Sequence, residues 1–431
     1  MKKILSLFLV ISLVTASVFA GGQSESESSQ SDVTATGSKI TFLNSKGEIQ
    51  VALEDMAVAY KAETGNEVEI LACGAGEVPY TKVTTLYNAG NAPTLSMLDS
   101  TDVYALYDTY ALNLSEEKWV SEVGSNALSI DGEVYAYPFC VEGRGIIYNG
   151  DAIDSALGRH VDMSTINSTE IFEALLSELR DNGMEYPVFL AKEDWSLGAH
   201  QLGYLYDAYE GDVDTLNKEL RAGFNANDNE MFNQLIDTLD LLIEFNYFHN
   251  DPLGADYDEG AMLLADGTVA FWANGSWAWP NMAEGGAEAD DNFGFLPFFL
   301  GNDSSYFANT KMQASPSKFV IIDGAQATAE DQQAAKDFLN WLVYSETGQE
   351  MFVNDAALIS AAKNNSVPQS NPLSQDIVEK LAENNTYYIA GFAAPSDHWS
   401  VMGAAMQKYV AGLSTREELA SSFDEYWVKQ Q

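Results

Sequence analysis

Histidines, cysteines and paired carboxylates are the side chains that most often bind metal ions or take part in catalysis. The four histidines never form a His-x-x-x-His pair, and the two cysteines, Cys73 and Cys140, lie far apart in the chain. A tetrahedral metal site would therefore need ligands from scattered positions. The sequence also has no Gly-x-Ser-x-Gly or Walker motif, and residues 74–76, Gly-Ala-Gly, lack the third glycine of a dinucleotide-binding loop. We expect no metal and no cofactor.

The charge of the chain limits the ligands that it can bind. It has 64 acidic against 21 basic residues, a net charge of −43 and a pI of 4.1. This charge excludes a broad nucleic-acid interface or an anionic lipid surface, and we expect a neutral or cationic ligand. With so many acids, chance carboxylate pairs are unavoidable, so a glycoside hydrolase stays open as an alternative.

Short apolar runs alternate with amphipathic helices, which is typical of an α/β protein. Strands are expected at residues 39–43, 67–71 and 94–98, with helices between them that end at Gly65 and Gly90. This is a β-α-β-α-β order. Because ligands bind beyond the carboxyl ends of parallel strands, the loops at residues 44–48 and 99–102 should face the ligand.

The same alternation continues further along the chain. Two strands are expected at residues 134–140 and 145–148, followed by an apolar helix that ends at Gly183. A second helix should begin at the Thr328-x-x-Asp331 capping signal, and the C-terminal helix at Ser414-x-x-Glu417. The 46% apolar content is enough for sizeable buried cores, which excludes a disordered chain.

The first residues indicate export. Lys2 and Lys3 precede an apolar run at residues 4–14, and residues 18–20, Val-Phe-Ala, fit a processing site, so we expect residues 1–20 to be a cleaved signal peptide. Residues 21–38 are rich in Ser and Glu and predict a flexible leader. No cysteine at or just after Ala20 could carry a lipid. We expect a periplasmic or extracellular, non-lipidated protein with no stable membrane insertion.

Three segments, read in order, carry a resemblance to a known family. They are residues 131–149 (DGEVYAYPFCVEGRGIIYN), 266–280 (DGTVAFWANGSWAWP) and 335–342 (AKDFLNWL). From residue 39 to residue 431 the chain resembles the extracellular solute-binding proteins of carbohydrate ABC importers. The resemblance implies a receptor, not an enzyme, that binds a neutral mono- or oligosaccharide and presents it to the membrane permease of an ABC transporter.

The resemblance also implies a two-lobed α/β fold of the periplasmic-binding-protein (Venus-flytrap) type. The first lobe would take residues 39–141 and 320–358, and the second lobe residues 142–319 and 359–431. Crossing segments near residues 140–144, 317–323 and 357–363 would act as the hinge. We expect a monomer whose lobes close over the sugar.

Sugar recognition needs flat aromatic surfaces for the C–H faces of the ring and planar acceptors for its hydroxyls. Trp277, after Asn-Gly-Ser, and Trp399 match family positions that stack on sugar, while Glu142 and Asp99 match positions that hydrogen-bond hydroxyls. Trp195, in a loop after an expected strand, would add a third aromatic surface.

The first loop supplies the remaining expected ligand contacts. Residues 44–48 keep a Lys-Gly pair that is similar to the family pattern but carry Asn and Ser where an acid is expected. We assign ligand contacts here to Asn44, Lys46 and Glu48.

Several of these residues have a structural alternative. Glu142 could instead pair with Arg144, and Asp99 could cap a helix. Trp341, inside an apolar helix stripe, should be a core residue, whereas Trp279 fits either role equally. A receptor for iron or a polyamine on the same fold also stays open, as does a disulfide between the two cysteines.

Overall fold

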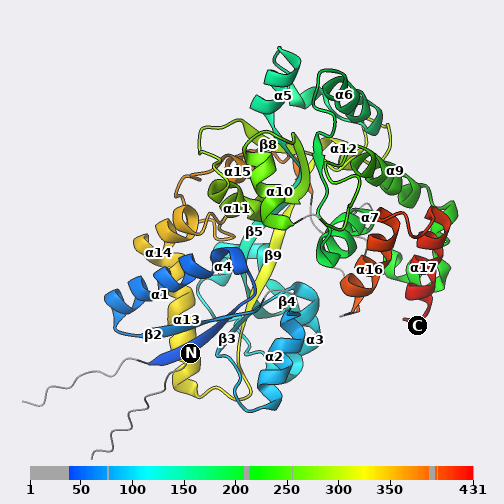
Figure 1. Cartoon of the computed structure of the whole chain (residues 1–431). Helices are drawn as coiled ribbons and strands as arrows, with labels where there is room; N and C mark the ends of the chain where they lie inside the picture. Colours follow the sequence, from blue (N-terminus) through cyan, green and yellow to red (C-terminus); the bar gives the residue numbers. More distant parts are fainter. Residues whose placement is uncertain are drawn as a thin grey trace, which may run out of the picture. The chain divides into compact units, whose positions relative to one another are not determined.

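The computed structural model describes residues 38–74, 77–207, 213–254, 256–387, 394–395 and 397–430 (Figure 1). The signal peptide expected over residues 1–20 and the leader expected over residues 21–38, apart from Ser38, lie outside these residues. Within the described part of the chain, no helix is both long and apolar enough to cross a membrane.

The N-terminal β-α-β-α-β order is confirmed. Strands β1 and β2 pair in parallel from Lys39↔Glu67 to Asn44↔Ala72, and β1 also pairs in parallel with β3. The helix between β1 and β2 ends as predicted at Gly65, which has a φ of 79° that glycine adopts without strain. The elements are β1 (Lys39–Asn44), α1 (Gln50–Thr64), β2 (Glu67–Ala72), α2 (Pro79–Asn88), β3 (Leu95–Leu98) and α3 (Ser100–Tyr110).

The two strands expected at residues 134–140 and 145–148 form a single strand, β5 (Glu133–Asn149), so that division was wrong. The polar residues in its middle do not break the strand, because β9 (Met312–Ile322) pairs with it in antiparallel fashion and buries them. Irregular register near Cys140 marks a bulge in this pairing. Figure 1 shows β5 and β9 running along each other, and in the sheet they lie between β3 and β7.

The strands of the described residues form a ten-stranded sheet with the order β2-β1-β3-β9-β5-β7-β6, joined at its sides by three further strands. Strand β7 follows α10 and pairs with β5 at Arg144↔Gly275. The elements that complete the sheet are β4 (Leu128–Ile130), β6 (Val188–Phe189), β7 (Phe271–Gly275), β8 (Phe293–Leu296) and β10 (Thr386–Tyr387).

The remaining helices surround these strands (Figure 1). They are α4 (Val120–Val123), α5 (Gly150–Leu157), α6 (Thr169–Asp181), α7 (Leu202–Asp207), α8 (Val213–Gly223), α9 (Glu230–Glu244), α10 (Tyr257–Ala265), α11 (Trp279–Glu284), α12 (Phe307–Thr310), α13 (Ala329–Tyr344), α14 (Glu346–Glu350), α15 (Pro372–Ala382), α16 (His398–Val410) and α17 (Arg416–Val428). A stretch of π-helix, η4 (Ser196–Gln201), leads directly into α7.

Two predicted helix starts differ in outcome. The capping box of α13, Thr328 with Asp331, is confirmed. At α17 the box is formed by Thr415 and Glu418, one residue later than predicted. Both spacings fit the capping pattern, and the apolar face of the helix selects between them, since it must bury Leu419, Phe423 and Trp427.

The core contains the tryptophans assigned to it. Trp341 is 7% exposed, packs on Phe338 and Tyr60, and donates a 2.6 Å hydrogen bond to Glu63, so its predicted core role is confirmed. Trp279 is also buried and packs against Phe293, which favours the structural alternative for it. A separate cluster of buried side chains joins α6, α9, α16 and α17.

Candidate ligand-binding site

The loop after β1 is held in shape by Asn44. Its amide nitrogen donates to the Lys46 carbonyl at 2.7 Å and to Gln50 at 2.9 Å, and its amide oxygen accepts from the Lys46 backbone N–H at 2.9 Å. Asn44 is 1% exposed. It therefore positions this loop through its own bonds, and its predicted ligand contact remains a prediction.

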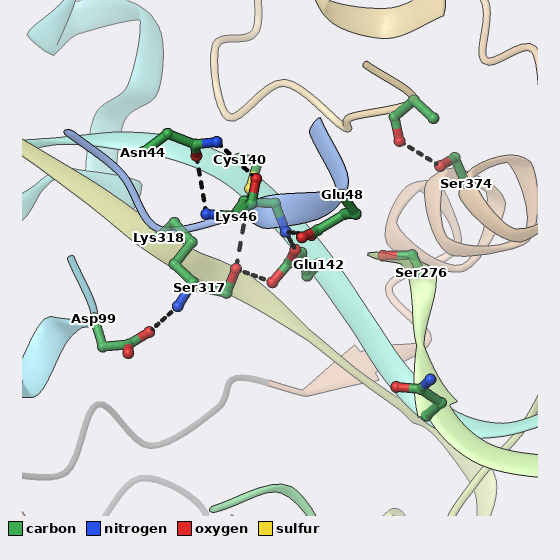
Figure 2. A network of polar contacts seen from close by, with 12 residues as sticks. Asn44, Lys46, Glu48, Asp99, Cys140, Glu142, Ser276, Ser317, Lys318 and Ser374 are labelled. Carbon is green, nitrogen blue, oxygen red and sulfur yellow. Dashed lines mark hydrogen bonds and ion pairs between the residues drawn. The ribbon is translucent and has the colours of Figure 1, made fainter. Parts of the chain in front are cut away.

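Lys46, Glu48 and Glu142 form a charged group in which Lys46 and Glu142 are buried and Glu48 is partly exposed (Figure 2). The Lys46 ammonium pairs with Glu48 at 2.6 Å and with Glu142, whose other oxygen accepts a hydrogen bond from Ser317. Burial opposes both charges, but Glu142 and Glu48 raise the pKa of Lys46 well above its usual value, and Lys46 holds the pKa of Glu142 low. The alternative that pairs Glu142 with Arg144 is wrong.

Asp99 accepts a 2.5 Å hydrogen bond from Lys318 of β9 (Figure 2). Asp99 occupies the N-cap position of α3, as the structural alternative predicted, but its side chain makes no capping hydrogen bond. Nearby Asp102 is 7% exposed, and burial together with the Asp99 charge raises its pKa to about 7. Lys318 was not among the predicted ligand contacts.

Arg144 is a second residue that the sequence analysis did not assign to the ligand. Side chains alternate along a strand, so Arg144 projects from the same face of β5 as Glu142. Its guanidinium donates to Gln313 of β9 and, at 3.0 Å, to Asp207 of α7, and it stacks over Tyr204 at 4.6 Å. Strand β5 thus carries the Glu142 carboxylate and, two residues later on the same face, the paired Arg144 guanidinium.

Trp277 follows β7 in a short helical turn, η6 (Ser276–Ala278), and is partly exposed. A Cβ atom at Gly275 would lie 2.0 Å from the indole, so only glycine permits this close approach. The Ser276 hydroxyl accepts a 3.2 Å hydrogen bond from the Gly143 N–H, which fixes the turn against β5. The small residues before Trp277 therefore serve to seat the ring itself.

Trp195 and Trp277 are joined through His200. The His200 ring lies 4.7 Å from Trp277 and 5.2 Å from Trp195, measured between ring centroids. Trp195 also lies 5.8 Å from Tyr257, whose hydroxyl accepts a 3.0 Å hydrogen bond from Asn274. We call Trp195, His200, Tyr257 and Trp277 the aromatic wall.

The aromatic wall lies near the charged group of the first loop. Burial raises the pKa of Tyr257, and the charges of Glu48 and Lys46 also act on it. Likewise burial lowers the pKa of His200 well below its usual value, with further contributions from Arg144, Lys318 and Lys46. The bond from the Gly143 N–H to Ser276 sets the Trp277 turn beside Glu142, so the structure brings the charged group close to Trp277 and, through His200, to Trp195. Sequence spacing alone gave no signal for His200 or Tyr257.

Trp399 is the second residue of α16 and is partly exposed. Its helix packs closely on η4, since a Cβ at Gly198 would lie 2.3 Å from the Trp399 carbonyl oxygen. Within the described residues Trp399 makes no ring contact with the aromatic wall, so its predicted stacking role remains a prediction. The described residues also contain no cluster of His, Cys, Asp and Glu suited to a metal ion.

Two cavities lie away from these side chains. One, of about 630 Å³, lies between α4 and the segment at residues 359–369, and another, of about 550 Å³, lies beside α5. Neither contains a predicted ligand contact. Lys46 and Glu142 are only 4% and 5% exposed, so in this conformation almost none of their surface is open to a ligand.

Comparison with known proteins identifies the family and the fold. A family model for bacterial extracellular solute-binding proteins matches residues 55–380. Solved structures with the same α/β periplasmic-binding-protein fold include the solute-binding protein RafE with raffinose (TM-score 0.71, 17% identity, 91% of this chain and 99% of that one). A chitin oligosaccharide binding protein (0.71, 17%, 91% and 98%) and a sugar transporter from Bacillus licheniformis with stachyose (0.67, 17%, 91% and 100%) are similar to the same extent. The chain belongs to the bacterial extracellular solute-binding protein family.

Proposed function

We propose that this protein captures a neutral mono- or oligosaccharide outside the cytoplasm and delivers it to the membrane permease of an ABC transporter. The observation that carries the proposal is the closeness of the Glu142 carboxylate to the aromatic wall that contains Trp195 and Trp277. Carboxylates accept hydrogen bonds from sugar hydroxyls, and indole rings cover the apolar sugar face. The sugars named for RafE and the other similar structures support the same ligand class.

The burial of the charged group favours binding through opening and closing. Lys46 and Glu142 are almost inaccessible, so a sugar reaches them only when the elements that carry them separate. We propose the lobes as residues 39–141 with 320–358, and residues 142–319 with 359–431, which places the junction on β5 and β9. A sugar that contacts both lobes then stabilises the closed state.

A thermal-shift screen tests this proposal. The mature chain is heated with raffinose, stachyose, D-galactose, maltotriose or chitin oligosaccharides, and a sugar at 100 times its Kd should add ~2.7 kcal/mol of stability. Chromatography of the same mixtures should recover the sugar unchanged, because a receptor releases its ligand intact. Stabilisation by none of the sugars, or stabilisation by spermidine or ferric citrate instead, would contradict the proposal. Sugar cleavage would favour the glycoside hydrolase.

A further inference from the structure

His200 lies in η4, a segment fixed from two sides. On one side a Cβ at Gly198 would meet Trp399 and Gly403 of α16, and on the other the Arg144 guanidinium donates a 3.4 Å hydrogen bond to the Ala199 carbonyl. Such close approach leaves the segment little room to move. The π-helical turn, a geometry that recurs at functional sites, ends one residue after His200. The fold therefore holds His200 firmly among the residues of the aromatic wall.

The polar atoms of this wall are left without protein partners. Among the described residues, the His200 Nδ1 atom and the Trp277 indole N–H are both buried and make no hydrogen bond. The two rings are tilted by 55° with centroids 4.7 Å apart, so the two unpaired atoms belong to rings that lie against each other. An unpaired buried polar atom costs folding stability, which a ligand that completes the bond recovers.

Electrostatics fixes the chemical form of the imidazole. Burial lowers the pKa of His200 well below its usual value, and the cations that act on it are Arg144, Lys318 and Lys46. The ring is therefore neutral at pH 7 and offers one nitrogen as donor and the other as acceptor. A charged partner is not required, and a hydroxyl group, which both donates and accepts, fits this pair.

We infer that His200 hydrogen-bonds a hydroxyl group of the bound sugar, between the rings of Trp195 and Trp277, and so sets which sugars the site accepts. The inference rests on the proposed function and adds a specificity-determining contact to it. The turn that carries Trp277 is bonded through Ser276 to Gly143, the neighbour of Glu142, so a sugar held by the charged group lies close to the ring pair of His200 and Trp277. The His200 contact joins the polar recognition at β5 and β9 to the stacking surfaces.

The test uses the mature chain and the sugar from the panel above that stabilises it most. His200→Phe keeps an aromatic ring between the two tryptophans but removes both nitrogens, whereas His200→Asn keeps an amide near the position of Nδ1. Calorimetric titration should show Kd raised about fivefold to tenfold by phenylalanine and partly restored by asparagine. His249→Phe is the matched control, since the His249 ring stacks on Tyr186 at 3.7 Å and is exposed.

Thermal unfolding of the sugar-free variants separates a binding role from a structural one. Removal of an unpaired buried nitrogen should leave the melting temperature unchanged or raised, while affinity falls. Analogues of the sugar that each lack one hydroxyl add a second readout. The analogue that lacks the hydroxyl bonded to His200 should bind the parent and His200→Phe with the same Kd. An unchanged Kd for His200→Phe, or a lower melting temperature in both variants with equal loss for all sugars, would overturn the inference alone. Failure of the parent to bind any sugar would overturn the proposed function, and the inference with it.

Discussion

Replacement of Trp277 by alanine should weaken sugar binding and leave the fold intact. One side of the indole is already covered by Gly275 and His200, and the ring is partly exposed. A ligand therefore covers about half of a side chain that offers roughly 200 Å² in total. At ~25 cal/mol per Å², loss of about 100 Å² of contact costs ~2.5 kcal/mol, or about 70-fold in Kd.

Trp341→Ala is the matched control because this tryptophan belongs to the core. It is 7% exposed, packs against Phe338 and Tyr60, and bonds to Glu63. Its removal leaves a cavity and should reduce the free energy of unfolding by ~3 to 5 kcal/mol. Sugar affinity of the fraction that remains folded should change little.

Calorimetric titration with the sugar identified by the screen, beside urea unfolding of the sugar-free proteins, gives both quantities for each variant. The two variants should show opposite patterns: affinity lost with stability kept for Trp277→Ala, and stability lost with affinity kept for Trp341→Ala. Equal affinity of Trp277→Ala and the parent would refute the stacking assignment. So would a loss of unfolding free energy as large as that of the control, because the ring would then be a structural element.

Three further predictions concern titration and thiol chemistry. The pKa of Asp102 is raised to about 7, so in the folded protein this carboxyl keeps a proton that it releases near pH 4 in the unfolded chain, and the free energy of unfolding falls as pH rises between these values. Urea unfolding should therefore show Asp102→Asn more stable than the parent by roughly 3 kcal/mol at pH 8, with a smaller gain at pH 5. Burial lowers the pKa of His398 to about 4, so the neutral ring stabilises the folded protein fully above pH 6.5, and this stabilisation is lost as pH falls towards 4. Over that interval the free energy of unfolding of His398→Gln should decline less than that of the parent. Cys73 and Cys140 are free, and burial raises the pKa of the Cys140 thiol to about 12. A thiol reagent should therefore label Cys73 alone in the native protein and both cysteines in denaturant. Labelling of only one cysteine in denaturant, or of none, would contradict this.

Local elements were predictable because their signals are local. The strand and helix order up to β3, the glycine end of α1 and the capping box of α13 follow from side chains within one or two turns of each other. The same reasoning misplaced the start of α17 by one residue, since two overlapping patterns satisfied the local rule. It also divided β5, because its polar middle resembles a loop until β9 is paired with it.

The candidate site was only partly predictable because its partners are distant in sequence. Lys46 meets Glu142 across 96 residues, and Lys318 meets Asp99 across 219. No periodicity encodes such pairs. The resemblance selected Trp277 and Glu142, but it gave no role to His200, whose surroundings depend on the packing of η4 between α16 and Arg144. The bonds that Asn44 makes to the backbone of its own loop were not predicted either, and its ligand contact stays a prediction.

The charge of the site differs from the charge of the chain, and this bears on the ligand. Three cations, Lys46, Lys318 and Arg144, are each bonded to a carboxylate contributed by another part of the chain. Together with Glu48 the four carboxylates exceed these cations by one charge, whereas the whole chain carries −43. Separating a buried pair without replacing its bonds is costly, so a ligand that enters must supply neutral donors and acceptors to both partners. Sugar hydroxyls supply both kinds of group, whereas a polyamine supplies only donors and would leave the lysines and Arg144 without acceptors. The paired cations therefore favour the neutral sugar over the cationic alternatives.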